Sequence, residues 1–241
     1  MRSAVILAAG RGTRLRSVLA DAPKGFLSLG EKPIIEESLA RLSAAGIADV
    51  VIVAGYQAEY YQALARRYPL SVRIVHNERF AESGSLYSLY CARNVVSEPF
   101  LLLESDIVYE QRALSELMGL ATPEAILLSS WTGAGDEVFV ETQDGFLKNM
   151  SKNRALLGGQ ISGELVGISK ISPALFDALM RNAARFLESS TMLEYEIHGL
   201  VEAAKTMKIP CPVADGLVWA EIDDEKQLQR VRERIYPLLA T

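Results

Sequence analysis

The first half of the chain alternates continuous apolar runs with segments of helical spacing, and this alternation constrains the fold more than any other feature. Continuous apolar runs are typical of strands buried on both faces, and such strands need helices on either side of their sheet. We expect strands at 4–8, 50–54, 72–76, 100–103 and 125–129. We expect helices at 34–45, 59–68, 86–95 and 114–119. The pattern predicts an α/β fold with a mixed, mainly parallel sheet in a three-layer arrangement.

The second half of the chain has a different pattern, with alternating strands and longer helices. Asp144-Gly145 is a hairpin turn signal, and Ser172-Pro173 and Asp224 signal helix starts. The expected strands are 137–142, 146–152, 163–169 and 217–222, and the expected helices are 173–187, 193–207 and 225–239. No linker interrupts these segments. We therefore expect one domain, 1–241, with a nucleotide-binding half at about 1–130 and an acceptor-binding half at about 131–241.

Composition excludes several classes of partner. Apolar residues make up 49% of the chain, which is ordinary globular composition, and the net charge of −5 gives no general attraction to nucleic acid or anionic membranes. Cys91 and Cys211 have no metal-like spacing and are expected to pack as small apolar residues. The apolar run before Gly10 is too short for a signal peptide or a membrane span, so we expect a cytoplasmic protein.

The glycine turn in AVILAAGRGTRLR, residues 4–16, departs from both familiar nucleotide fingerprints. A dinucleotide site needs a third glycine where Leu15 stands, and an acidic residue at the end of the second strand. A Walker loop is also absent. The glycines at 10 and 12 nevertheless allow the backbone N–H groups to approach an anion, and Arg14 and Lys24 add positive charge. The segment therefore favours a polyphosphate over a solvated turn.

These residues also carry a family resemblance. AVILAAGRGTRL, followed by APKGFLSLG, resembles the signature of the nucleotidyltransferases that activate sugar phosphates and alcohol phosphates. The resemblance implies their Rossmann-like fold, with the loop around the triphosphate of an NTP. It implies contacts from Ala8, Ala9 and Gly10 to the nucleoside, from Gly12, Thr13 and Arg14 to the phosphates, and from Lys24 to the reacting phosphorus.

Acidic residues follow two of the expected strands. Asp106 comes directly after the strand at 100–103, while Glu221 and Asp223 lie at the end of the strand at 217–222. Carboxylates from two strand ends can meet at one Mg²⁺, which binds carboxylate and phosphate oxygens. Asp223 is free for this role because Asp224 is placed to cap the following helix. The family resemblance assigns the catalytic Mg²⁺ to the positions of Asp106 and Asp223, and the catalytic group is expected to be Lys24, Arg14 and Asp106.

Six further blocks narrow the resemblance to one group. They are ESD at 104–106, GDEVFVET at 135–142, MSKNRALLGG at 150–159, GELVGISK at 163–170, LEYE at 193–196 and VWAEID at 218–223. They resemble the cytidylyltransferases of the phosphocholine and 2-aminoethylphosphonate group, more closely those acting on the phosphonate. The resemblance implies CTP as donor and 2-aminoethylphosphonate as acceptor. It places Ser83, Gly84 and Ser85 where the base is read, whereas the phosphocholine branch tends to carry asparagines there.

The acceptor is expected to contact Asp136, Lys152, Glu196 and Glu221. Lys152 is the candidate for the phosphonate group, and the acidic residues suit a primary ammonium, which donates hydrogen bonds. A quaternary ammonium would need an aromatic cage, for which Trp131, Tyr195 and Trp219 are available, although these are expected in the core. Phosphocholine transfer and a non-catalytic nucleotide-binding module remain alternatives. The expected partners are small molecules, with neither nucleic acid nor membrane, and a homodimer is left open.

Overall fold

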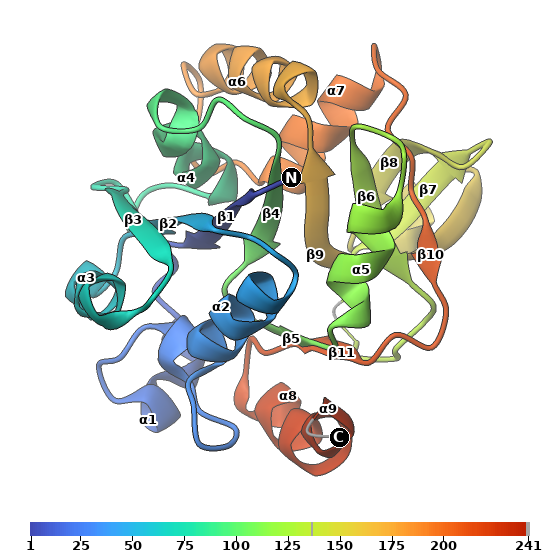
Figure 1. Cartoon of the computed structure of the whole chain (residues 1–241). Coiled ribbons are helices and arrows are strands. Elements are labelled where there is room, and N and C mark those ends of the chain that lie inside the picture. The colour runs from blue at the N-terminus through green and yellow to red at the C-terminus, as the bar shows by residue number, and fades with distance from the viewer. Residues whose placement is uncertain (136, 240–241) are drawn as a thin grey trace.

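The computed structural model describes residues 1–135 and 137–239, and its centre is a twisted sheet (Figure 1). The strand order is β10-β6-β9-β4-β1-β2-β3, with the hairpin β7–β8 joined to β9. The bounds are β1 Ser3–Ala8, β2 Asp49–Ala54, β3 Ser71–His76, β4 Phe100–Glu104, β6 Ala125–Ser129, β7 Phe139–Gln143, β8 Phe146–Ser151, β9 Gln160–Ile171 and β10 Val213–Ala214. Strands β3, β2, β1 and β4 run parallel, whereas β9 is antiparallel to β4 and β6. The mixed, mainly parallel sheet is confirmed.

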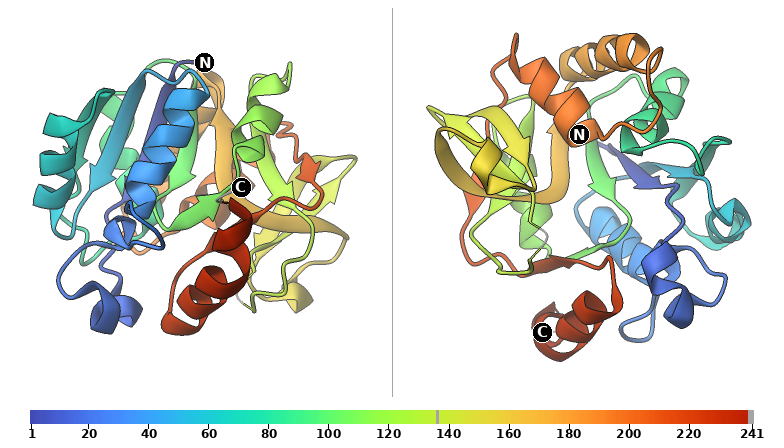
Figure 2. Two further views of the ribbon diagram at one scale, coloured as in Figure 1. Left: turned by 60° about the horizontal axis from the view of Figure 1, so that its bottom comes forward. Right: turned by 180° about the vertical axis from the view of Figure 1, so that it is seen from behind.

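Helices cover both faces of this sheet, as two further views show (Figure 2). One face packs against α2 Ile34–Ala44, α3 Ala58–Arg67 and α5 Arg112–Gly119. The other packs against α4 Ser85–Cys91, α6 Pro173–Phe186, a π-helical segment Tyr195–Val201 and α7 Glu202–Ala204. Alternate residues of β1 enter the two cores, Ile6 on one side and Val5 on the other. The three-layer arrangement is therefore also confirmed.

A smaller core lies beyond the carboxyl ends of the central strands. There β5 Ile107–Tyr109 and β11 Trp219–Glu221 form an antiparallel ribbon. It packs against α1 Arg16–Leu19 and the C-terminal helix, which runs through α8 Glu225–Arg230, Val231–Ile235 and α9 Tyr236–Leu239. Figure 1 shows this layer below the sheet. The ribbon matters for the site because it brings the acidic residues after β4 beside those after β11.

Local sequence explains most element boundaries. The hydroxyl of Ser172 accepts a hydrogen bond from the N–H of Leu175 at 3.1 Å, and Pro173 occupies the first turn of α6. Asp224 and Gln227 form a reciprocal capping box at the start of α8, as the sequence predicted for Asp224. Gly46, with φ of +83°, follows α2 and provides the expected stop.

Several expectations about elements were wrong in detail. The helix predicted at 193–207 begins at Tyr195, is π-helical to Val201 and ends at Ala204. Residue Leu193 is held outside it, because its carbonyl accepts a hydrogen bond from the N–H of Leu86 at 3.0 Å. The sequence also missed β5 and β10, which are too short for a periodic signal. Within the described ranges, no helix has the length and apolar character needed to cross a membrane.

Candidate active site

The loop after β1 forms one wall of the site. Gly12 has a φ of +56°, in the left-handed region that favours glycine, and starts a tight turn at Thr13–Leu15. A Cβ added to Gly12 would approach Cγ of Lys24 to 3.0 Å, so the stem of Lys24 lies along this loop. A Cβ on Gly10, by contrast, would meet nothing within 4 Å. The backbone conformation of this loop therefore requires glycine at position 12. At position 10 the absence of a side chain leaves open space beside the loop.

Lys24 joins this loop to the two aspartates. It follows the extended residue Pro23, and its Nζ donates to Oδ2 of Asp106 at 2.6 Å and also to Oδ1 of Asp223. Its side chain is only 12% exposed. Burial alone would lower the pKa of Lys24, but the charges of Asp106 and Asp223 and their hydrogen bonds raise it overall. Lys24 therefore remains a protonated ammonium between two carboxylates.

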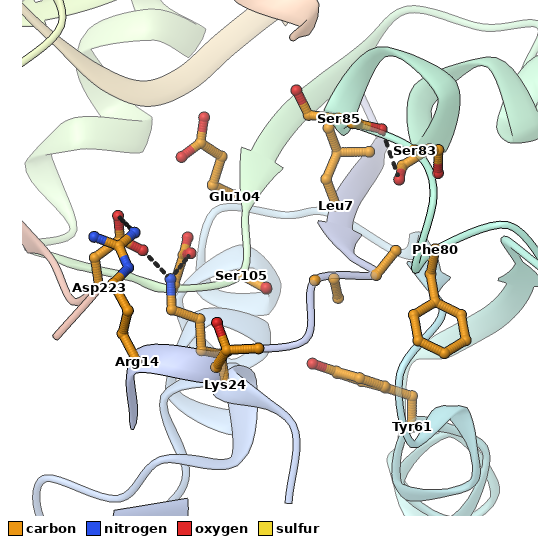
Figure 3. A pocket seen from close by; sticks show the side chains of 18 of the residues that line it. Leu7, Arg14, Lys24, Tyr61, Phe80, Ser83, Ser85, Glu104, Ser105 and Asp223 are labelled. Carbon is orange, nitrogen blue, oxygen red and sulfur yellow. Dashed lines mark hydrogen bonds and ion pairs between the residues drawn. The ribbon is translucent and has the colours of Figure 1, made fainter. Parts of the chain in front are cut away.

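Arg14 completes this ion-pair cluster, which Figure 3 shows from close by. Its guanidinium donates to Oδ2 of Asp223 at 2.6 Å, although its side chain is 61% exposed. Burial would raise the pKa of Asp223, but Lys24 and Arg14 together lower it. The ribbon sets the position of this aspartate, because the N–H of Ile222 donates to the carbonyl of Asp106 at 3.0 Å. Asp106 and Asp223 thus come together, as the sequence predicted for two strand ends.

Further acidic residues lie beside the aspartates. One carboxylate oxygen from each of Glu104, Asp106 and Glu221 lies within 4.8 Å of the other two. Burial, and then Asp106 and the other nearby carboxylates, raise the pKa of Glu221 to about 9. Burial followed by the charges of Glu196 and Asp106 raises the pKa of Glu104 well above its usual range. So many close carboxylates favour a cation here, and oxygen donors of this kind suit Mg²⁺.

These residues surround a cavity of about 310 Å³ at the carboxyl edge of the sheet. Its lining includes all ten residues expected to hold the nucleotide: Ala8, Ala9, Gly10, Gly12, Thr13, Arg14, Lys24, Ser83, Gly84 and Ser85. Ligands bind at this edge in open α/β sheets, and the volume falls in the usual range for small-molecule sites. The fold therefore brings the predicted residues together, while their individual roles stay predictions.

The segment at 83–85 is held against the segment that precedes the π-helix. The N–H of Gly84 donates to the carbonyl of Thr191 at 2.8 Å, and the N–H of Tyr195 donates to the hydroxyl of Ser85 at 2.9 Å. A Cβ on Gly84 would come within 2.2 Å of the carbonyl oxygen of Leu193. Glycine is required at this position because the two backbones are in contact.

A second, smaller cavity of about 50 Å³ adjoins the first, and Glu104 and Glu196 line both. Lys152 and Glu221 line it, as expected for the acceptor, while Asp136 lies outside the described residues. The remaining charged residues of its lining are Glu137, Glu164 and Arg230. The hydroxyl of Ser85 donates to Glu196 at 3.3 Å, and burial raises the pKa of Glu196 to about 7. Glu196 thus contacts the first cavity while forming part of the second.

The three aromatic residues that were available for a cage have different surroundings. Tyr195 is buried and its hydroxyl donates to Glu104 at 2.8 Å, whereas the buried Trp219 donates its indole N–H to Ser129. Trp131 is 50% exposed and packs against Phe139. Of the three, Trp219 lines the second cavity. The expectation that the three aromatic residues belong to the core is confirmed for Tyr195 and Trp219, and it is wrong for Trp131, which lies at the surface.

Sequence reasoning missed several residues in the walls of the first cavity. Tyr61 and Phe80 line it from α3 and from the segment before α4, and Ser105 directly precedes the predicted Asp106. Tyr61 follows helical spacing and is indistinguishable from a core residue in the sequence. Glu104 belongs to the ESD block, but it was assigned no role from the sequence. The available signal was a carboxylate at the end of an apolar strand.

The two cysteines, Cys91 and Cys211, are both free, as expected.

Comparison with known protein families agrees with this site geometry. Residues 4–193 match the family model described as the MobA-like NTP transferase domain. The chain belongs to this family. This match confirms that the chain is a nucleotidyltransferase, and it leaves open which enzyme of the family it is.

The curated relatives are distant and differ in their acceptors. The chain is 32% identical to choline-phosphate cytidylyltransferase of Streptococcus pneumoniae over 114 residues, which are 47% of this chain and 49% of that protein. It is 28% identical to 2-aminoethylphosphonate cytidylyltransferase of Lancefieldella rimae over 190 residues, 78% and 72% of the two chains. It is 24% identical to a bifunctional IPC transferase and DIPP synthase of Aquifex aeolicus over 237 residues, 97% and 51% of the two chains. The chain thus spans about half the length of the first and third of these relatives.

Solved structures show the same fold. The inositol-1-phosphate CTP transferase from T. maritima has a TM-score of 0.85 and 20% identity, covering 100% of this chain and 95% of that one. CTP:phosphocholine cytidylyltransferase from Streptococcus pneumoniae has a TM-score of 0.76 and 22% identity, covering 97% and 99%. At these identities the likeness concerns the fold alone. It confirms the Rossmann-like nucleotidyltransferase architecture.

Proposed function

We propose that this MobA-like NTP transferase is a cytidylyltransferase that joins CMP from CTP to 2-aminoethylphosphonate and releases pyrophosphate. The observation that carries the proposal is the acidic second cavity, which shares Glu104 and Glu196 with the cavity of the glycine loop. A donor bound along the loop would place its α-phosphate near an acceptor in the second cavity. Four of the named relatives and neighbours are called cytidylyltransferases or CTP transferases, which supports CTP as the donor.

The lining of the second cavity supports an acceptor with a primary ammonium. Glu164, Glu196 and Glu221 offer carboxylates that can accept the hydrogen bonds of such a group. In the described part of the lining, Trp219 is the aromatic residue, so a cage around a quaternary ammonium lacks partners. Lys152 suits the phosphonate group, since it is a point charge on the same wall. The small volume also favours a compact acceptor over a polyol phosphate.

The chemistry needs little covalent participation by the protein. A phosphonate oxygen of the acceptor forms a bond to the α-phosphorus of CTP, while the bond from that phosphorus to the bridging oxygen breaks and its electron pair leaves with pyrophosphate. The acceptor oxygen is ionised near neutral pH, so no general base is required. Lys24 and Arg14 would neutralise the phosphates and hold them in line, which is the main source of catalysis in such transfers.

Asp106 and Asp223 would hold the Mg²⁺ ion that accompanies the triphosphate. The donor set fits, because it consists of carboxylate oxygens that already hold a cation, the ammonium of Lys24. When bound, the ion would supply Lewis-acid stabilisation of the phosphate charge. A cytoplasmic location, the two-half organisation and a homodimer stay predictions.

The decisive experiment incubates the protein with CTP, Mg²⁺ and one acceptor at a time, followed by phosphorus NMR. The acceptors are 2-aminoethylphosphonate, phosphocholine and inositol 1-phosphate. With 2-aminoethylphosphonate we expect pyrophosphate and CMP-2-aminoethylphosphonate as products. We expect kcat/KM for this acceptor to be well above the values for phosphocholine and inositol 1-phosphate. Preference for phosphocholine would contradict the acceptor assignment. Absence of pyrophosphate with every acceptor would favour a non-catalytic nucleotide-binding module.

A further inference from the structure

Two basic side chains occupy the carboxylates that are proposed to hold the metal. Lys24 contacts Oδ2 of Asp106 and Oδ1 of Asp223, and Arg14 contacts Oδ2 of Asp223. Three of the four carboxylate oxygens of these aspartates therefore already have charged partners. The aspartate side chains are 19% and 10% exposed and that of Lys24 is 12% exposed, so the two ion pairs of Lys24 are largely shielded from water. A divalent ion could use these oxygens only after the ion pairs separate, which carries a free-energy cost.

The geometry also provides a place for both cations to go. The stem of Lys24 lies against Gly12, at the loop expected to hold the triphosphate, and Arg14 belongs to that loop. Lys24 is anchored by its backbone in a short turn, Lys24–Phe26, so rotation of its side chain alone can redirect Nζ. A triphosphate beside Gly12 offers new anionic partners to both side chains.

We propose that Lys24 and Arg14 keep the divalent-metal site closed in the nucleotide-free protein, and that a nucleoside triphosphate opens it by taking over both cations. Metal and nucleotide then bind as a pair, because each carboxylate that loses a basic partner gains the divalent ion. This inference rests on the proposed function only in assuming that the anionic ligand is a triphosphate. Lys24 thus has a second role, in metal loading, besides the stabilisation of the reacting phosphate.

The test measures Mn²⁺ binding to the nucleotide-free protein by electron paramagnetic resonance of the free ion. Wild-type protein is expected to bind Mn²⁺ weakly. Lys24→Met frees an oxygen on each aspartate and is expected to raise the affinity by at least about tenfold. Arg14→Leu frees an oxygen of Asp223 and is expected to give a smaller gain. Because Arg14 is largely exposed, this second variant keeps the test valid if Lys24→Met fails to fold.

The matched control is Lys32→Met, which removes the same charge from an exposed position outside the site. It is expected to leave Mn²⁺ affinity unchanged, so an equal gain in this variant would assign the effect to net charge and overturn the proposal. Equal Mn²⁺ affinity of wild type and both Lys24→Met and Arg14→Leu would also overturn it. The readout needs no turnover. A gain in Mn²⁺ affinity without any pyrophosphate from CTP would therefore reject the proposed function and retain this inference.

Discussion

At the scale of single residues, Lys24 has the greatest influence on the site, since one side chain links the glycine loop to both aspartates. Lys24→Ala and Asp106→Ala are each expected to lower kcat by about 10² or more, because the first removes a positive charge beside the transferring phosphate and the second removes a proposed ligand of the Mg²⁺ ion. The measurement is steady-state release of pyrophosphate, with circular dichroism as the check on folding. Lys32→Ala, an exposed lysine near the same segment, is the control. Near-normal kcat in a folded Lys24→Ala protein would contradict the assignment.

Gly10 tests the phosphate loop separately from the fold. An alanine Cβ at this position would meet no protein atom within 4 Å, so Gly10→Ala should fold with unchanged stability. A bound nucleotide would occupy that space, and we expect CTP affinity to fall by about tenfold or more, since a close backbone approach is lost. Isothermal titration with CTP and Mg²⁺ measures the change. Unchanged affinity would show that the nucleotide does not approach Gly10.

At the scale of elements, the segment 83–85 depends on its contact with the segment at 191–195. Gly84→Ala places a Cβ within 2.2 Å of the carbonyl oxygen of Leu193, so one backbone must move away from the other. We expect KM for CTP to rise by about tenfold, because the base-binding wall shifts. Gly119→Ala is the matched control, since its Cβ would meet nothing within 4 Å at the end of α5. Equal KM values for Gly84→Ala and Gly119→Ala would rule out a role of this segment.

The β7–β8 hairpin offers a pH-dependent contribution to stability. The hydrogen bond from Lys148 lowers the pKa of the buried Glu141 below its usual value. Burial acts in the opposite direction, and the hydrogen bond from the N–H of Gly158 lowers this pKa further. A lowered folded-state pKa stabilises the protein above the unfolded-state value, and this stability is lost as pH falls through the folded-state value. Glu141→Gln should therefore cost about 1 kcal/mol at neutral pH.

The difference between wild type and Glu141→Gln should shrink as the pH falls below the usual glutamate value of 4.5. Urea unfolding at several pH values measures it. Glu116→Gln is the control, because Glu116 is 46% exposed and its ion pair with Arg112 lies at the surface. A difference that grows towards acid pH would contradict the sign of this prediction.

At the scale of the whole molecule, the site joins segments from nearly the full length of the chain. The loop after β1, the segment before α4, the π-helix and the aspartates next to the ribbon, Asp106 and Asp223, all line it. A ligand that binds only this assembled site stabilises the folded state by mass action, by about 2.7 kcal/mol at 100 times its Kd. We expect CTP with Mg²⁺ to raise Tm by about 5–10 °C. Mg²⁺ alone should raise Tm much less, since Lys24 and Arg14 hold the aspartates. An equal shift with Mg²⁺ alone would contradict coupled binding.

The sequence by itself determined the layered α/β architecture, the glycine loop and the two aspartates after strands. These features depend on local patterns, namely apolar periodicity, caps and turns, which short segments carry. β1, β2 and β3 appear within one residue of their predicted bounds for this reason. The nucleotidyltransferase class was implied by the family resemblance of the segments AVILAAGRGTRL and APKGFLSLG.

Only the tertiary structure decided which charges meet. The pairing of Lys24 with Asp223 and the sharing of Glu104 and Glu196 between two cavities join residues distant in the chain. β5 was invisible because a three-residue strand forms only when its partner β11 supplies the hydrogen bonds. The antiparallel insertion of β9 between β4 and β6 is likewise a matter of partner choice. These contacts between distant residues depend on the packing of the whole chain, whereas the approach of Asp106 to Asp223 was predictable because both follow strand ends.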